Sequence, residues 1–133
     1  MRRSTQALFL ALALVWFPGT GAAVDCGDLG SQAEMNQCAL AESQFADRDL
    51  DALCDQYLER LGERQKRLFT EAHKAWVRFR DLACEFESSG AEGGSAYPFV
   101  VQNCLTAMTR ARIERMRSLA QCEEGDAACP ARK

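Results

Sequence analysis

The chain has 133 residues, a formal net charge of −3, a hydrophobic fraction of 47% and seven cysteines. A single domain is expected at this length. The negative charge argues against nucleic acid and anionic membrane surfaces as partners, because both recruit clusters of Lys and Arg, and it is compatible with a cationic protein partner.

Residues 1–23 have the features of a secretory signal peptide. Two arginines precede an apolar run that is shorter than the roughly 20 residues needed to span a bilayer, and small residues end at Ala23. Cleavage there removes two Arg and no acid, so the mature chain has a net charge of −5 instead of −3. A lipoprotein signal would place a cysteine directly after the small residues, but Cys26 follows Val24 and Asp25. We therefore expect a periplasmic or secreted protein without a membrane anchor.

Disulfides are expected, because small exported domains with limited cores are commonly cross-linked. The cysteine spacings contain no CxxC pair, and the single histidine, His73, cannot complete a Cys/His zinc set. We therefore expect no metal ion and no cofactor. The odd number of cysteines leaves one thiol without a partner.

The first helix is expected to begin at a capping box formed by Ser31 and Glu34. The serine oxygen accepts a hydrogen bond from a free backbone amide, and the glutamate interacts with the cap in return. This helix is predicted to end near Phe45 and Ala46, where Asp47 would cap a second helix.

Apolar residues then recur at helical intervals from Leu50 to Phe86, except in a polar run that starts at Gly62. Two alternatives are open. One is a continuous, bent helix from Asp47 to Glu87, and the other is a break near Gly62, where glycine costs about 1 kcal/mol relative to alanine. The absence of a proline or a turn dipeptide favours the continuous helix.

The segment Ser88–Tyr97 is rich in Gly and Ser and is expected to be a loop. Pro98 suits the first position of the following helix, where its missing amide costs nothing. That helix completes a helical domain at 24–121. A polar tail at 122–133 follows, and a Cys122–Cys129 disulfide could close it into a small ring.

A disulfide between Cys84 and Cys104 would hold the last two helices antiparallel and present the loop as a closed tip. We therefore expect an all-α fold, a small disulfide-stapled antiparallel bundle of three to four helices. In this register Arg112 lies opposite Trp76, which predicts contact between the guanidinium and the indole. The same register pairs Leu105 with Ala83, Met116 with Ala72 and Leu119 with Phe69.

Three motifs follow one another in the second half of the chain. They comprise Trp76, Phe79, Arg80, Asp81 and Cys84, then Gly93, Gly94, Ser95 and Pro98, then Cys104, Leu105, Met108, Thr109 and Arg112. Two further matches, E-M-N-x-C-A and A-D-x-x-L, start at Glu34 and Ala46. Together they resemble the LprI-like family over nearly the whole mature chain, from Cys26 to Leu119.

The LprI-like family comprises small exported helical domains and takes its name from a mycobacterial lipoprotein that inhibits lysozyme. The resemblance therefore implies an inhibitor of lysozyme, and it implies a Cys26–Cys38 disulfide. This chain lacks the lipid-attachment cysteine and has Asp51 and Cys54 where the family usually has asparagine and tyrosine. A turn at Ala46 would instead place Cys38 opposite Cys54. Otherwise Cys54 is the unpaired thiol, buried as a small apolar residue.

No enzyme is predicted. His73 is expected to be an exposed helix residue, and a Ser95–His73 nucleophile pair would need the loop to fold back about three helical turns. A glycosidase-like pair can be drawn from Asp81, Glu85 and Glu92, but it carries little weight in a chain with 19 acidic residues.

Structural roles are expected for the motif residues outside the loop. Trp76 and Phe79 are predicted to lie in the core. Arg80 and Asp81 are predicted to tie down the base of the loop. The remaining structural residues of the motifs are Pro98, Thr109 and Arg112.

The loop is the predicted binding site for a protein partner, a cationic lysozyme. Ser95, the Tyr97 hydroxyl and the backbone amides of Gly93 and Gly94 could donate hydrogen bonds to the catalytic carboxylates and sugar-binding groups of such an enzyme. Glu92 adds negative charge, which steers association with a cation. The alternative is that the glycines serve the turn alone.

Two other classes of function are weighed against inhibition. An adaptor module of the cell envelope would be favoured by contiguous apolar surface at Val77, Leu82 or Val100, since monomers seldom leave large apolar patches bare. A hydrolase would need a concave pocket with convergent polar groups, for which a narrow helical hairpin has little room.

Overall fold

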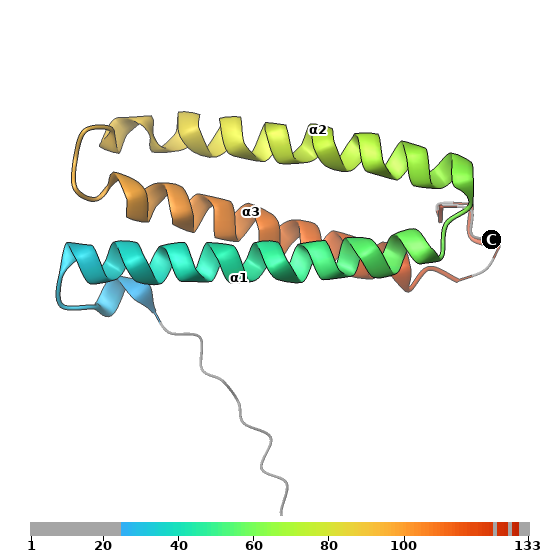
Figure 1. Cartoon of the computed structure of the whole chain (residues 1–133), viewed down its shortest axis with the longest axis horizontal. Helices are drawn as coiled ribbons and strands as arrows, with labels where there is room; N and C mark the ends of the chain where they lie inside the picture. The colour runs from blue at the N-terminus through green and yellow to red at the C-terminus, as the bar shows by residue number, and fades with distance from the viewer. Residues whose placement is uncertain (1–24, 124, 128, 131–133) are drawn as a thin grey trace, which may run out of the picture.

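The structure is a computed structural model that describes residues 25–123, 125–127 and 129–130. Three long helices lie alongside one another, α1 (Gln32–Glu59), α2 (Glu63–Ser88) and α3 (Tyr97–Ala120), as Figure 1 shows. Two short 3-10 helices, η1 (Cys26–Asp28) and η2 (Ser89–Ala91), precede α1 and follow α2. The predicted all-α fold is confirmed. The predicted signal peptide at residues 1–23 lies outside the described residues.

Helix α1 is longer than the sequence pattern indicated. Its predicted capping box is present, because Ser31 Oγ accepts a hydrogen bond from the Glu34 amide at 3.2 Å and donates one to the Glu34 carboxylate at 2.7 Å. The predicted end at Ala46 is wrong. No Gly or Pro interrupts the helix, and Asp47 does not cap a new one but points its carboxylate at side chains of the other two helices.

The chain turns at Leu61 and Gly62, so the favoured continuous helix is wrong and the alternative break near Gly62 is correct. Gly62 is extended, with φ −71° and ψ 163°, and precedes α2. Leu61 is 2% exposed and packs with Tyr57, Ile113 and Met116 in the main core cluster. Burial of a leucine side chain contributes about 1.5–3 kcal/mol, which exceeds the local preference for continuing a helix.

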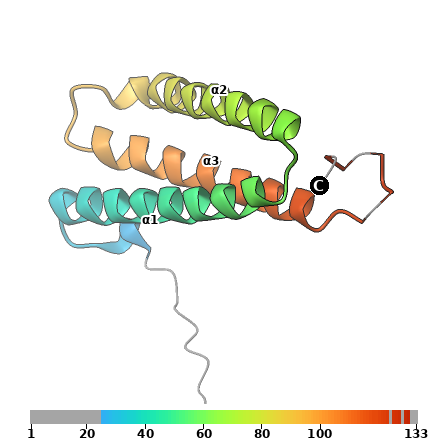
Figure 2. The ribbon, with the colours of Figure 1, turned by 45° about the vertical axis from the view of Figure 1, so that its right-hand side comes forward.

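Helix α3 packs against both other helices and makes its more extensive contact with α1 (Figures 1 and 2). The apolar core cluster lies toward the turn at Leu61. Toward the other end, the small buried residues Ala39, Ser43 and Ala46 of α1 face α3, and Ser43 Oγ donates a hydrogen bond to Gln102 Oε1 at 2.5 Å. Small residues at this end let the two helices approach closely.

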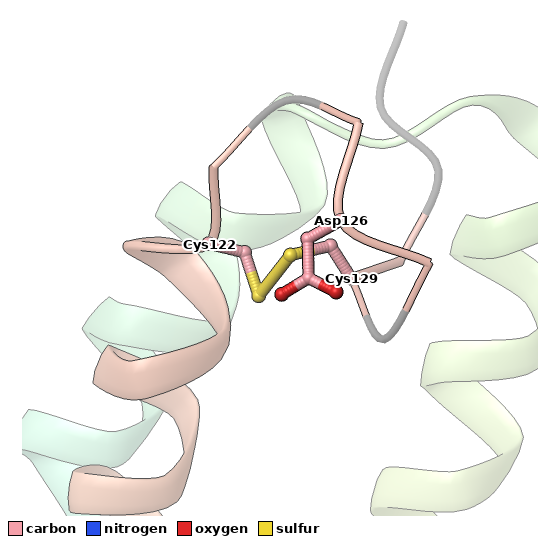
Figure 3. A group of neighbouring side chains, drawn as sticks. All are labelled: Cys122, Asp126 and Cys129. Carbon is pink, nitrogen blue, oxygen red and sulfur yellow. A yellow bond between two sulfur atoms is a disulfide. The ribbon is translucent and has the colours of Figure 1, made fainter.

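Three disulfides cross-link the described chain. They include the expected pairs Cys84–Cys104 and Cys26–Cys38. Cys84 and Cys104 join α2 to α3 with a Cα–Cα distance of 5.5 Å. Cys26–Cys38 joins η1 to α1 at the same Cα–Cα distance, and Cys122–Cys129 closes the tail into a ring (Figure 3). Cys54 is free and buried. The alternative pairing of Cys38 with Cys54 is wrong, because both lie on one continuous helix.

Candidate functional site

The side chain of Arg80 connects the three helices. Its side chain is buried, and its Nη1 donates hydrogen bonds to Asp47 Oδ1 of α1 at 2.6 Å and to Thr109 Oγ1 of α3 at 2.9 Å. Its Nε also donates to Asp81 Oδ1 on its own helix at 2.9 Å. Its guanidinium carbon lies 5.5 Å from the Trp76 ring centroid. Arg80 therefore contacts all three helices and positions them relative to one another.

Replacing Arg80 with methionine is expected to lower the free energy of unfolding by about 2 kcal/mol. Breaking a buried charge pair costs about 3–5 kcal/mol, but Asp47 keeps a side-chain exposure of 46%, so water compensates part of the loss. Urea unfolding measures the change. Arg78→Met is the matched control, because Arg78 is exposed on the same helix and should change stability little. Equal losses in the two variants would contradict this role of Arg80.

The predicted register of α2 against α3 places Arg112 against Trp76, and the guanidinium carbon of Arg112 indeed lies 5.4 Å from the indole centroid. The prediction that Phe79 lies in the core is wrong, because Phe79 is 60% exposed. The face of α2 that contacts α3 and α1 includes polar residues. Compared with the face that the apolar pattern predicts, the inner face is shifted by about one residue along the sequence. The residues of this inner face are Phe69, His73, Trp76, Arg80 and Cys84.

The shift of the inner face of α2 leaves an apolar row on its outer surface. Phe79, Leu82 and Phe86 are spaced three and four residues apart, so they share one helix face. Their exposed fractions are 60%, 54% and 79%. Phe86 is the most exposed of the large apolar side chains in the described chain. We call these three residues the apolar row.

His73 is half-buried, so the prediction that it is exposed is wrong. Its ring lies against Phe69 and Trp76, with centroid separations of 5.9 and 6.1 Å, and its Nδ1 lies 3.8 Å from Cys54 Sγ. Burial, followed by the nearby charge of Arg112, lowers the pKa of His73. Burial likewise raises the pKa of the Cys54 thiol to about 11. Both groups are therefore neutral near pH 7.

The loop between α2 and α3 is shorter and more closely bonded than expected, since α2 continues through Ser88. Gly93 has a φ of 77°, which favours glycine. The Gly94 amide donates to the Ala91 carbonyl at 3.0 Å, so it is already used within the loop. The Ser95 carbonyl accepts a hydrogen bond from Asn36 Nδ2 of α1 at 3.0 Å, which ties the loop to α1. Gly93 thus has a clear backbone role, and the Gly94 amide has its partner within the loop.

Two residues of the predicted binding loop lie next to the apolar row. A shallow hollow lies between the last turns of α2 and the start of α3. Its lining residues are Leu82, Glu85, Phe86, Ser89, Glu92 and Tyr97. Among the predicted binding residues, Glu92 and Tyr97 are therefore brought together with Phe86. Gly93, Gly94 and Ser95 lie outside this lining.

Negative charge accumulates at the same end of the bundle. Residues 25–47 and 81–109 contain acidic residues but no Lys or Arg, and the start of α1, the end of α2 and the start of α3 meet at this end (Figure 1). We call it the acidic end. Its nine acidic residues are Asp25, Asp28, Glu34, Glu42, Asp47, Asp81, Glu85, Glu87 and Glu92.

Three of these nine carboxylates are paired with arginine. Glu42 pairs with Arg110, and Asp47 and Asp81 both pair with Arg80. Among the described residues, no Lys or Arg lies within ion-pair distance of the other six. The charges are visible in the sequence, but only the topology of the bundle brings the two acidic segments together.

A comparison with protein families finds that the lysozyme inhibitor LprI model matches residues 25–116. The chain belongs to the lysozyme inhibitor LprI family. The match runs from η1 into α3 and so includes the Arg80 contacts, the loop and the acidic end. LprI is a family of inhibitors, not of enzymes, and its proteins are typically exported.

A curated relative is the uncharacterized protein R02472 of Rhizobium meliloti (strain 1021). It is 28% identical over 113 residues, which cover 75% of this chain and 81% of the relative. No solved structure matches the chain. None of the described helices combines the length and apolar character that crossing a membrane requires.

Proposed function

We propose that the protein is an exported inhibitor of lysozyme-type peptidoglycan hydrolases, which it blocks by occluding the substrate cleft without turnover. One observation carries the proposal: the apolar row ends at the hollow formed by Phe86, Glu92 and Tyr97, at the acidic end of a bundle from the LprI family. Cross-linking by disulfides supports a place outside the cytoplasm, since such bonds persist in oxidising compartments.

The acidic end has the composition of a binding surface for a cationic enzyme. Lysozymes are strongly cationic as a class, so unpaired carboxylates such as Glu85 and Glu92 would accelerate encounter by long-range attraction. Exposed aromatic side chains commonly supply most of the binding free energy at the centre of an interface, with charged groups around them. Phe79 and Phe86 take the central place in this arrangement, and Tyr97 lines the hollow beside Phe86.

An envelope adaptor is the second candidate, and an apolar surface favours it. Val77 and Leu82 line a further shallow hollow along α2, and Val100 on α3 is 37% exposed. An adaptor would bind another envelope protein through the apolar row and would not inhibit lysozyme. The two functions therefore differ in one measurable property, which is inhibition of muramidase activity.

The experiment that tests the proposal measures clearance of a peptidoglycan suspension by lysozymes of several types. Protein expressed from the full sequence and purified from the exported fraction is expected to suppress at least one of them at a stoichiometric ratio, and to remain intact. Muramidase activity that is untouched by a micromolar excess, across all types, would remove the inhibitor proposal and leave the adaptor.

Reversing two charges at the hollow is expected to slow association with lysozyme by about tenfold at low ionic strength. The variant combines Glu85→Lys with Glu92→Lys, and the difference should shrink as salt screens the field. The matched control combines Glu59→Lys with Glu71→Lys, which changes the net charge equally at exposed positions outside the acidic end. Surface plasmon resonance at several salt concentrations measures both. Equal slowing in the two variants would mean that total charge, not the acidic end, directs binding.

A further inference from the structure

Each of the three helices contributes one soft or nitrogen donor atom to a single place in the bundle interior. Cys54 comes from α1, His73 from α2 and Met116 from α3. Cys54 Sγ lies 3.8 Å from His73 Nδ1 and 3.7 Å from Met116 Sδ. Neither the inhibitor proposal nor the Arg80 contacts use these three side chains.

The two sulfur donors are shielded from water, and the imidazole is half-buried. Met116 is 1% exposed and Cys54 is 6% exposed, and the half-buried His73 ring is held by stacking against Phe69 and Trp76. A neutral imidazole has a lone pair available for a metal ion. Cys54 is a free, buried thiol, and a metal ion can displace the proton of a thiol.

The two separations from Cys54 Sγ suit donors that share one metal ion. With metal–sulfur distances of about 2.3 Å and metal–nitrogen distances of about 2.0 Å, neighbouring donors around a three- or four-coordinate ion lie about 3.5–4.0 Å apart. Thiolate and thioether sulfur select copper(I) among biological ions, and imidazole also binds copper. Calcium and magnesium require oxygen ligands, so these side chains do not suit them.

The charge balance of the site favours a monovalent ion. Replacing the thiol proton by Cu(I) leaves the total charge of the site unchanged, whereas a divalent ion would add an uncompensated charge to the interior. We propose that Cys54, His73 and Met116 bind one Cu(I) ion between the three helices. The copper–sulfur bond forms as the Cys54 proton passes to solvent, and no electron is transferred because copper enters in its reduced state.

The test loads the exported protein, with its disulfides intact, with Cu(I) and ascorbate under anaerobic conditions and then competes with the chelator bicinchoninate. Ascorbate leaves disulfides intact, so Cys54 is the sole thiol offered among the described cysteines. The expected result is one Cu(I) retained per chain, with X-ray absorption showing two sulfur neighbours and one nitrogen neighbour. Loss of all copper to the chelator would overturn the proposal and leave Cys54 as a thiol that hydrogen-bonds within the core.

Substitutions of the proposed ligands test which side chains bind the copper ion. Cys54→Ser is expected to abolish retention, and Met116→Leu, which keeps the side-chain volume, to weaken Cu(I) affinity at least tenfold. Met108→Leu is the matched control, because Met108 Sδ lies 3.6 Å from Cys84 Sγ, a sulfur already bonded to Cys104. Circular dichroism confirms that each variant is folded before loading. Retention that is unchanged in Met116→Leu, or reduced equally in Met108→Leu, would contradict the assigned site, even if Cys54→Ser failed to fold.

Discussion

Replacing Phe79 and Phe86 together with serine is expected to weaken lysozyme binding by about a thousandfold and to leave the free energy of unfolding nearly unchanged. Aromatic residues at the centre of an interface contribute about 2 kcal/mol or more each, and two of them correspond to about a thousandfold in affinity. Folding should tolerate the change because both side chains are more than half exposed, at 60% and 79%. Isothermal titration calorimetry gives the affinity, and urea unfolding gives the stability.

The matched control for this variant changes an exposed apolar residue elsewhere. Leu68 on α2 is 57% exposed and lies outside both the apolar row and the acidic end. Its replacement by serine should leave lysozyme binding within about twofold of the parent, since surface changes away from an interface are nearly neutral. If the control lost affinity as strongly as the Phe79 and Phe86 variant, the binding surface would lie elsewhere.

Removing the Cys84–Cys104 disulfide by joint substitution with alanine is expected to lower the free energy of unfolding by about 3 kcal/mol, the value that chain entropy gives for a loop of this length. Cys84 is 0% exposed, so lost packing adds to the effect. Inhibition should also weaken, because this bond fixes the ends of α2 and α3 that frame the hollow. Urea unfolding and muramidase inhibition are the two measurements.

The tail disulfide provides the control for inhibition. Joint replacement of Cys122 and Cys129 by alanine removes a disulfide (Figure 3) that follows α3, at the end of the bundle opposite the loop between α2 and α3 (Figure 1). Inhibition should persist in that variant. A Cys84 and Cys104 variant that unfolds at the same urea concentration as the parent would contradict a stabilising role for the bond.

Local and covalent features of the fold could be predicted from the sequence. The capping box at Ser31 depends on residues three apart, and the hairpin depends on a covalent pair, so neither needs knowledge of distant contacts. The two helix boundaries depend on tertiary partners. Asp47 has the chemistry of a cap, but its carboxylate is taken by Arg80 and Thr109. The break at Gly62 has a weak local signal and is stabilised by the burial of Leu61.

The inner face of α2 depends on tertiary partners in the same way. Hydrophobicity alone assigns Phe79 and Phe86 to the core, because it does not foresee that Arg80 will be buried with a carboxylate and a hydroxyl as partners. Once Arg80 and His73 point inward, the two phenylalanines must face solvent. The Gly and Ser content of residues 88–97 predicts the loop, but its association with Phe86 and with the acidic start of α1 requires the folded chain.

The central claim is that the acidic end and the apolar row contact lysozyme. Amide hydrogen exchange of the protein, measured free and saturated with lysozyme, tests it. We expect slower exchange in the complex at residues 82–97, with little change at residues 55–70, near the turn at Leu61. Slower exchange confined to residues 55–70, with residues 82–97 unaffected, would contradict it.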